Sequence, residues 1–180
     1  MALQTGARAP YFDLPGTDGR HYSLTTYADK AATVVVFTCN SCPEARWYDD
    51  RMIDIARDYY DVDVAVVAIN ANDAEASPED SFAKMKRLAQ DQGLSFPYLL
   101  DEDQRAARAY GATCTPEVFV VDAGGTIVYH GAIDDHPQDP LAPGTDYLRD
   151  ALDELITGKP VSQADTEPHG SPIVWKSEAD

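Results

Sequence analysis

The chain has 180 residues, the usual size of one domain, and its 44% hydrophobic and 25% charged residues are typical of a globular protein. This composition excludes wholesale disorder, collagen and coiled coil, and no apolar run reaches the roughly 20 residues that span a bilayer. The 31 Asp and Glu outnumber the 14 Lys and Arg, and the net charge of −17 disfavours nucleic acid and membranes as partners, because it repels phosphate backbones and anionic lipids.

The first half of the chain begins with a predicted β-hairpin over residues 8–24. The apolar run 33–37 is short and rich in β-branched residues, as in a strand that is buried on both faces. A helix is expected to begin near Pro43, because proline is favoured in a first helical turn, and to run to about Tyr59. The run 62–69 repeats the pattern of a buried strand.

The second half adds three helices and a second hairpin. A start that resembles a capping box at 77–80 predicts one helix, and a shorter helix should stop at Gly111. Residues 117–121 and 126–129 flank a glycine turn and are expected to pair as antiparallel strands. A last amphipathic helix is predicted between Thr145 and Gly158.

This order of elements predicts an α/β fold, with a mixed β-sheet flanked by helices, as one domain over residues 1–158. Residues 159–180 contain three prolines and no periodicity, so they are expected to form an irregular tail. The tail should pack on the domain through the apolar triplet 173–175, because exposing apolar surface costs about 25 cal/mol per Å².

The strongest chemical signal is the pair Cys39 and Cys42, separated by Asn40 and Ser41. The pair lies directly after a predicted buried strand and before a predicted helix, which is typical of a redox dithiol. Helix-terminal amides would favour a thiolate at Cys39, and Cys42, about one turn further on, could displace a mixed disulfide. The alternative is two buried and unreactive thiols.

These motifs, together with Thr115-Pro116 before the strand 117–122, resemble the thioredoxin-like superfamily. Residues 6–14 resemble the redoxin branch of this superfamily, the alkyl hydroperoxide reductase/thiol-specific antioxidant (AhpC/TSA)-like proteins. Residues 111–117 are similar to those of a peroxiredoxin-like subgroup within that branch. The resemblance covers roughly residues 6–158 and implies a thioredoxin-like fold.

The resemblance also implies roles for individual residues. Pro116 should be cis and face the attacking sulfur, and Thr115 should present its backbone to the substrate. Thr38, which precedes the dithiol, is the third expected substrate-binding residue. The peroxiredoxin pattern Pro-x-x-x-Thr-x-x-Cys is not matched, since Val36 stands three residues before Cys39.

Three further residues are candidates for an accessory role. Glu44 and Glu117 could move the proton of the dithiol, but this rests on their proximity alone, and the favoured interpretation of each is a solvated carboxylate. Cys114 should lie near the active site by virtue of Thr115-Pro116, either as a buried thiol that acts as a small hydrophobe or as a regulatory or resolving thiol.

The sequence therefore predicts a thiol–disulfide oxidoreductase with Cys39 as nucleophile and Cys42 as resolving thiol. It needs no cofactor, and its expected partners are protein or small-molecule disulfides and a reductase or low-molecular-weight thiol. One alternative is a peroxiredoxin-like thiol peroxidase. A less favoured one is a metal carrier that uses both thiolates, with or without His130, since soft thiolates suit Cu(I). The run 134–136 is interpreted as an acidic loop rather than a metal site.

The acidity is spread over the whole chain, with 23 Asp and 5 Lys. We interpret it as adaptation to molar salt, in which a Debye length of about 3 Å removes self-repulsion. The alternative is simply a well-solvated surface. The N-terminal residues lack the basic and apolar regions of a secretory signal, so a cytoplasmic protein is expected.

Overall fold

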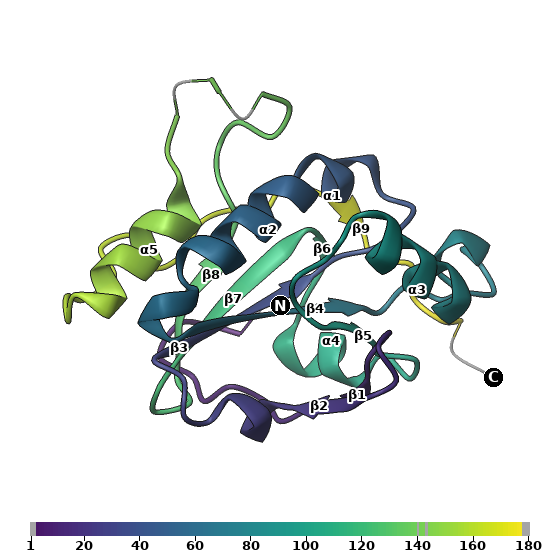
Figure 1. The fold of residues 1–180 in the computed structure, drawn as a ribbon, viewed down its shortest axis with the longest axis horizontal. Coiled ribbons are helices and arrows are strands. Elements are labelled where there is room, and N and C mark those ends of the chain that lie inside the picture. The colour runs from purple at the N-terminus through teal and green to yellow at the C-terminus, as the bar shows by residue number, and fades with distance from the viewer. Residues whose placement is uncertain (1–2, 140, 143, 178–180) are drawn as a thin grey trace.

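The computed structural model describes residues 3–139, 141–142 and 144–177 (Figure 1). Its centre is a five-stranded sheet of order β5-β4-β3-β7-β8. The strands of this sheet are β3 (Ala32–Phe37), β4 (Val64–Asn70), β5 (Tyr98–Leu100), β7 (Glu117–Asp122) and β8 (Ile127–Gly131). The first three are parallel to one another, whereas β7 is antiparallel to both β3 and β8. The expected α/β fold with a mixed sheet is confirmed.

Helices cover both faces of this sheet (Figure 1). They are α1 (Pro43–Trp47), α2 (Asp49–Asp58), α3 (Phe82–Asp91), α4 (Arg105–Tyr110) and α5 (Tyr147–Ile156). Alternate residues of β3 point to opposite faces. Val34 and Val36 pack in a cluster that contains residues of α2, α3 and α5, while Val35 and Phe37 pack in a second cluster with residues of α4. This burial on both faces explains why the strand reads as a continuous apolar run.

The N-terminal hairpin is also confirmed. It consists of β1 (Asp13–Pro15) and β2 (His21–Ser23), which are antiparallel, and it lies on the same side of the sheet as α4 (Figure 1). Among the described residues, no helix has both the length and the apolarity that a membrane span requires.

Two predicted helices differ from those in the structure. The helix expected over 43–59 is divided at Tyr48 into α1 and α2, where the Tyr48 ring is buried and its hydroxyl donates to Asp134 at 3.0 Å. The helix expected to follow the capping-box-like start 77–80 begins at Phe82, and that start is itself a separate 3₁₀ turn over Pro78–Asp80, in which the Asp80 side chain is buried. In both places a buried side chain with a polar contact stands just before the helix begins.

The tail pairs first with the edge strand β8 and then with a short strand near the C-terminal end of β3. The His130 amide donates to the Ala164 carbonyl oxygen, and the Thr166 amide donates to the His130 carbonyl oxygen, both at 2.9 Å. Further on, β9 (Ser171–Pro172) pairs antiparallel with β6 (Cys114–Thr115).

Candidate active site

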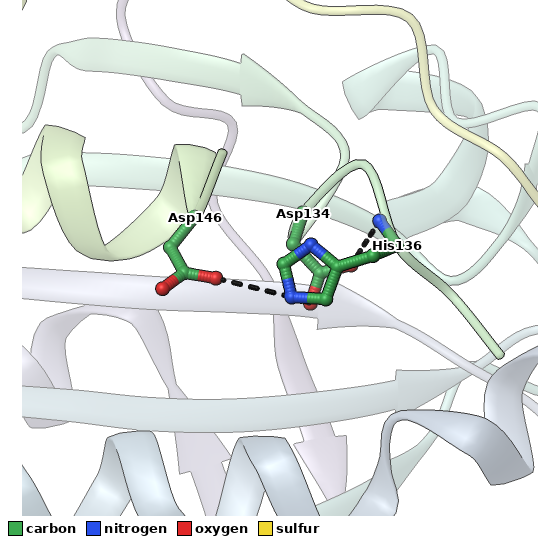
Figure 2. Close-up of side chains that lie close together, drawn as sticks. All are labelled: Asp134, His136 and Asp146. Atoms are coloured by element: carbon green, nitrogen blue, oxygen red, sulfur yellow. Dashed lines mark hydrogen bonds and ion pairs between the residues drawn. The ribbon is translucent and has the colours of Figure 1, made fainter. Parts of the chain in front are cut away.

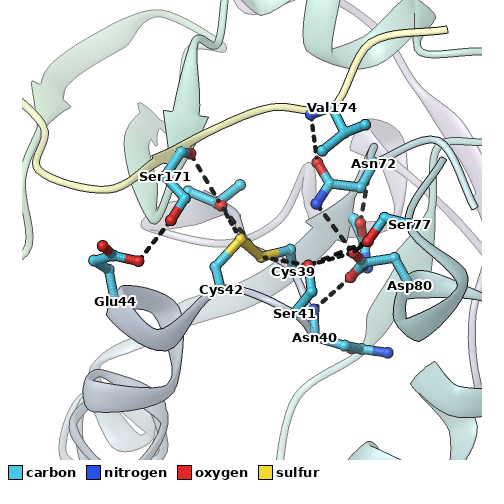
Figure 3. The surroundings of a disulfide bond; sticks show 12 residues. Cys39, Asn40, Ser41, Cys42, Glu44, Asn72, Ser77, Asp80, Ser171 and Val174 are labelled. Atoms are coloured by element: carbon cyan, nitrogen blue, oxygen red, sulfur yellow. Dashed lines mark hydrogen bonds between the residues drawn. A yellow bond between two sulfur atoms is a disulfide. The ribbon is translucent and has the colours of Figure 1, made fainter.

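Cys39 and Cys42 form a disulfide where β3 ends and α1 begins (Figure 3). Their Cα atoms are 5.8 Å apart, within the usual range for a disulfide. Pro43 occupies the first turn of α1, as expected, and Cys42 is the residue that precedes the helix. Both cysteines are buried: Cys39 is 0% exposed and Cys42 4%. The pair is thus a closed redox centre, shielded from solvent in its oxidised form.

Thr115 is the closest polar neighbour of the disulfide. Its Oγ1 lies 3.0 Å from the Cys42 sulfur and 3.3 Å from the Cys39 sulfur. The Thr115–Pro116 peptide bond is cis, as expected. Thr115, the last residue of β6, therefore faces both sulfur atoms and directly precedes the cis-proline.

Asp80 supports the other side of the dithiol loop, and the sequence did not reveal it. The Asn40 amide and the Ser41 hydroxyl both donate to its carboxylate at 2.6 Å (Figure 3). The Ser41 oxygen in turn lies 4.0 Å from the Cys39 sulfur. The two residues between the cysteines are thus held by one carboxylate.

The Asp80 carboxylate is 0% exposed and receives three more hydrogen bonds from its own neighbourhood. The donors are Ser77 at 2.7 Å, Asn70 at 3.0 Å and Asn72 at 3.1 Å. Burial alone would raise the pKa of Asp80, but these bonds and that from Ser41 outweigh it and lower the pKa below its ordinary value. The site therefore contains a buried carboxylate that is charged at neutral pH.

A basic residue contacts the dithiol from α1. The Arg46 guanidinium donates to the Cys39 carbonyl oxygen at 2.6 Å and pairs with Asp49 at 2.9 Å. Burial raises the pKa of Asp49 to about 6, although Arg46 opposes the shift. Thr38, predicted to bind substrate, continues the sheet through its amide, which donates to the Ile69 carbonyl oxygen at 2.9 Å. Thr38 also lines a small pocket with Pro116, Arg46 and Asp49.

Glu117 is fully buried, so the favoured interpretation of this residue as a solvated carboxylate is wrong. Its carboxylate accepts from the amides of Thr113 at 2.7 Å and Cys114 at 3.2 Å, and it pairs with the His130 ring at 2.6 Å. Burial would raise the pKa of Glu117, but His130 and the two amides lower it overall. Glu117 thereby anchors the segment that leads into Thr115.

Cys114 precedes Thr115 and remains a free, buried thiol. Its sulfur lies 3.8 Å from the Glu117 carboxylate. Burial, reinforced by the charge of Glu117, raises the pKa of the Cys114 thiol to about 12. This thiol is protonated at neutral pH and is therefore a poor nucleophile.

Glu44 lies at the start of α1 and receives a hydrogen bond of 2.6 Å from the Ser171 hydroxyl of the tail (Figure 3). This bond lowers the pKa of Glu44. The structure therefore gives Glu44 a contact with the segment that covers the disulfide.

The histidines considered for metal binding lie elsewhere. His130 is engaged by Glu117, and His136 lies in the loop before α5 beside Asp134 and Asp146 (Figure 2). Ligand atoms of these three residues lie within 4.8 Å of one another. However, the Arg51 guanidinium already pairs with Asp134 at 2.6 Å, so this cluster is a mixed ion-pair network.

Comparison with known proteins agrees with this geometry. The model of the AhpC/TSA family matches residues 5–130. The thiol-disulfide oxidoreductase ResA of Geobacillus thermodenitrificans is 27% identical over 128 residues, which are 70% of this chain and 68% of ResA. A Mycobacterium tuberculosis protein named "Putative peroxiredoxin Rv2521" is 29% identical over 138 residues, covering 70% of this chain and 83% of that protein.

Two solved structures match nearly the whole chain. The hypothetical protein SMc02350 of Sinorhizobium meliloti is 36% identical with a TM-score of 0.92, and it covers 98% of this chain and 97% of its own. An uncharacterized conserved protein of Geobacillus kaustophilus is 39% identical with a TM-score of 0.90, covering 98% and 94%. The family match, the paired cysteines and the cis-proline loop together place this chain in the AhpC/TSA family of the thioredoxin-like superfamily.

Proposed function

We propose that this protein is a thiol–disulfide oxidoreductase whose electrons are carried by Cys39 and Cys42. The observation that carries the proposal is the placement of both sulfur atoms within 3.3 Å of the Thr115 hydroxyl, beside the cis-Pro116 loop. The dithiol–disulfide couple itself transfers two electrons, so the reaction needs no further cofactor.

In the proposed reaction the reduced protein attacks a substrate disulfide. The Cys39 thiolate forms a bond to one substrate sulfur, the substrate S–S bond breaks, and the other substrate sulfur leaves as a thiolate. Cys42, once deprotonated, attacks the Cys39 sulfur and releases the second substrate thiolate. The substrate gains two electrons, the Cys39–Cys42 disulfide reforms, and a reductase or low-molecular-weight thiol restores the dithiol.

Reduction of insulin disulfides in the presence of dithiothreitol tests this proposal. Cys39→Ser should abolish the activity, whereas Cys42→Ser should accumulate mixed disulfides, because no thiol remains to displace them. Cys114→Ser is the matched control and should retain activity, since its thiol is protonated and bonded to Glu117. Mixed disulfides on Cys42 in the Cys39→Ser variant would reverse the two roles.

A peroxiredoxin-like thiol peroxidase is the second candidate, and it is supported by the family match and by the peroxiredoxin name of one relative. Peroxide would then oxidise one thiolate to a sulfenic acid, and the second thiol would condense with it to the disulfide and release water. Hydrogen peroxide consumption by the reduced protein separates the candidates. A rate no greater than that of a free thiol excludes the peroxidase.

We also propose that the acidic surface is adapted to high salt. The support is the net charge of −17, whose self-repulsion is screened more strongly as ionic strength rises. Cytoplasmic localisation stays a prediction from the sequence.

A further inference from the structure

A short segment of the tail, residues 170–174, covers the disulfide, and we call it the strap. Its middle residues pair as β9 with β6, in the register Cys114 with Pro172 and Thr115 with Ser171. The Ser171 carbonyl oxygen lies 3.5 Å from the Thr115 hydroxyl, the same hydroxyl that contacts both sulfur atoms. Figure 3 shows the strap passing over the Cys39–Cys42 bond.

The strap is built to approach the loop very closely. A Cβ atom at Gly170 would lie 2.2 Å from the Thr115 carbonyl oxygen and 2.9 Å from the Pro116 nitrogen. Since real Cβ contacts are never this short, only glycine allows the backbone to lie against the cis peptide.

Contacts on both sides hold the strap in place. The Ser171 hydroxyl donates to Glu44, and the Ile173 amide donates to the Thr113 carbonyl oxygen at 3.1 Å. The Ile173 side chain is 4% exposed and belongs to the core cluster that contains α4. The Val174 amide donates to the Asn72 side chain at 2.9 Å. The strap is therefore docked by polar and apolar contacts rather than lying loosely on the surface.

The strand edge of β6 is where an extended polypeptide could add by main-chain pairing, because unpaired strand edges accept further strands. In this protein that edge is already filled. We propose that the strap determines specificity: it occupies the position that a polypeptide disulfide would take beside Thr115, so such a substrate must displace it. The inference rests on the proposed thiol–disulfide exchange.

The strap should slow the reaction of large and small disulfide substrates to different extents. A small disulfide needs only a local opening that exposes one cysteine sulfur, and such a local opening costs less than displacing the whole segment. A polypeptide would bind along the whole edge of β6, so the pairing between β6 and β9 and the buried contact of Ile173 must be lost first. The intact strap should therefore favour small disulfides over polypeptides.

The test compares two substrates, insulin and 2-hydroxyethyl disulfide, in single-turnover oxidation of the reduced protein. Gly170→Ala pushes the strap from Thr115, and Ile173→Ser weakens its apolar anchor. The control Gly124→Ala adds the same methyl group in the β7–β8 turn, where the Cβ meets only Asp122, at 3.3 Å. Circular dichroism and melting confirm that each variant is folded.

Both strap variants should raise the insulin rate by about tenfold or more, the effect of about one net hydrogen bond, and raise the small-disulfide rate less. An unchanged ratio of the two rates in both variants overturns the proposal. If the reduced proteins react with neither substrate, the proposed function fails instead. In that case the role of the strap is tested by the rate at which dithiothreitol reduces the Cys39–Cys42 disulfide. This rate should be higher in both strap variants than in Gly124→Ala.

Hydrogen exchange gives a second measurement that leaves the strap sequence unaltered. Cys42→Ser protein is converted into mixed disulfides with a cysteine-containing peptide and with a methylthio group. The amides of Ile173 and Val174 should lose protection in the peptide adduct and keep more of it in the methylthio adduct. Equal protection in the two adducts contradicts displacement of the strap by a polypeptide.

Discussion

Replacing Asp80 by asparagine should make the Cys39–Cys42 disulfide easier to reduce. The carboxylate reaches Cys39 through Ser41, by contacts of 2.6 and 4.0 Å, so its oxygen lies within about 7 Å of the sulfur. At an effective dielectric constant of about 20, two unit charges at this separation repel by about 2.5 kcal/mol. The carboxylate thus opposes a thiolate on Cys39 and favours the uncharged disulfide.

This repulsion energy of about 2.5 kcal/mol determines the expected changes in the pKa of Cys39 and in the reduction potential. Asp80→Asn should lower the pKa of the Cys39 thiol by about 1 to 2 units, because one unit corresponds to 1.36 kcal/mol. At a pH above that pKa, the reduction potential should become less negative by up to about 50 mV. Alkylation rates against pH give the pKa, and equilibration with dithiothreitol or glutathione buffers gives the potential.

Two control variants separate the effect of the Asp80 charge from other effects of the substitution. Glu79→Gln removes one negative charge from the adjacent residue, whose side chain is 68% exposed, and should leave both values unchanged. Ser41→Ala removes the hydroxyl bridge but keeps the carboxylate charge, so it should shift the potential less than Asp80→Asn. If Asp80→Asn folds and keeps the wild-type pKa and potential, the electrostatic reasoning is refuted.

Three further predictions concern stability and the third thiol. Because burial raises the pKa of Asp49 from 3.8 to about 6, the folded state retains a proton that the unfolded state has lost in this window, and stability should fall as pH rises through it. Asp49→Asn should remove roughly 2 kcal/mol of that fall, measured by urea unfolding at pH 4 and 7, and equal pH slopes would contradict the assignment. The melting temperature should rise from millimolar to molar KCl, and a flat or falling curve would refute adaptation to salt. After mild peroxide treatment, peptide mapping should find the Cys39–Cys42 bridge with Cys114 reduced, whereas a Cys39–Cys114 bridge would show a resolving role for Cys114.

The fold was predictable because its strands are buried on both faces. The apolar runs 33–37 and 62–69 carry this information locally, and glycines mark the β7–β8 turn and the end of α4. The dithiol was also visible, because its spacing and its place between strand and helix are local features. The cis state of Pro116 was inferred only through resemblance.

The polar support of the site was not predictable, because its members come from separate segments. The residues that Asp80 binds lie in the dithiol loop, at the end of β4 and at Ser77, and no pattern in the sequence joins them. The only signal was three uncharged polar residues, Asn70, Asn72 and Ser77, at the end of a buried strand and in the segment that follows it. Likewise, β9 is a two-residue strand without periodicity, and only its partner β6 defines it.

The charges around the disulfide also predict the direction of electron flow. Asp80 holds the dithiol loop on one side and Glu117 anchors the segment before Thr115 on the other, and both have lowered pKa values. A positive charge beside the dithiol, that of Arg46, is already paired with Asp49, which is ionised above about pH 6. Reduction therefore adds a thiolate to a region that is already anionic, which favours the oxidised form and makes the dithiol a donor of electrons. We expect a reduction potential nearer to that of thioredoxin, about −270 mV, than to that of DsbA, about −120 mV, and a value at the DsbA end would contradict this electrostatic argument.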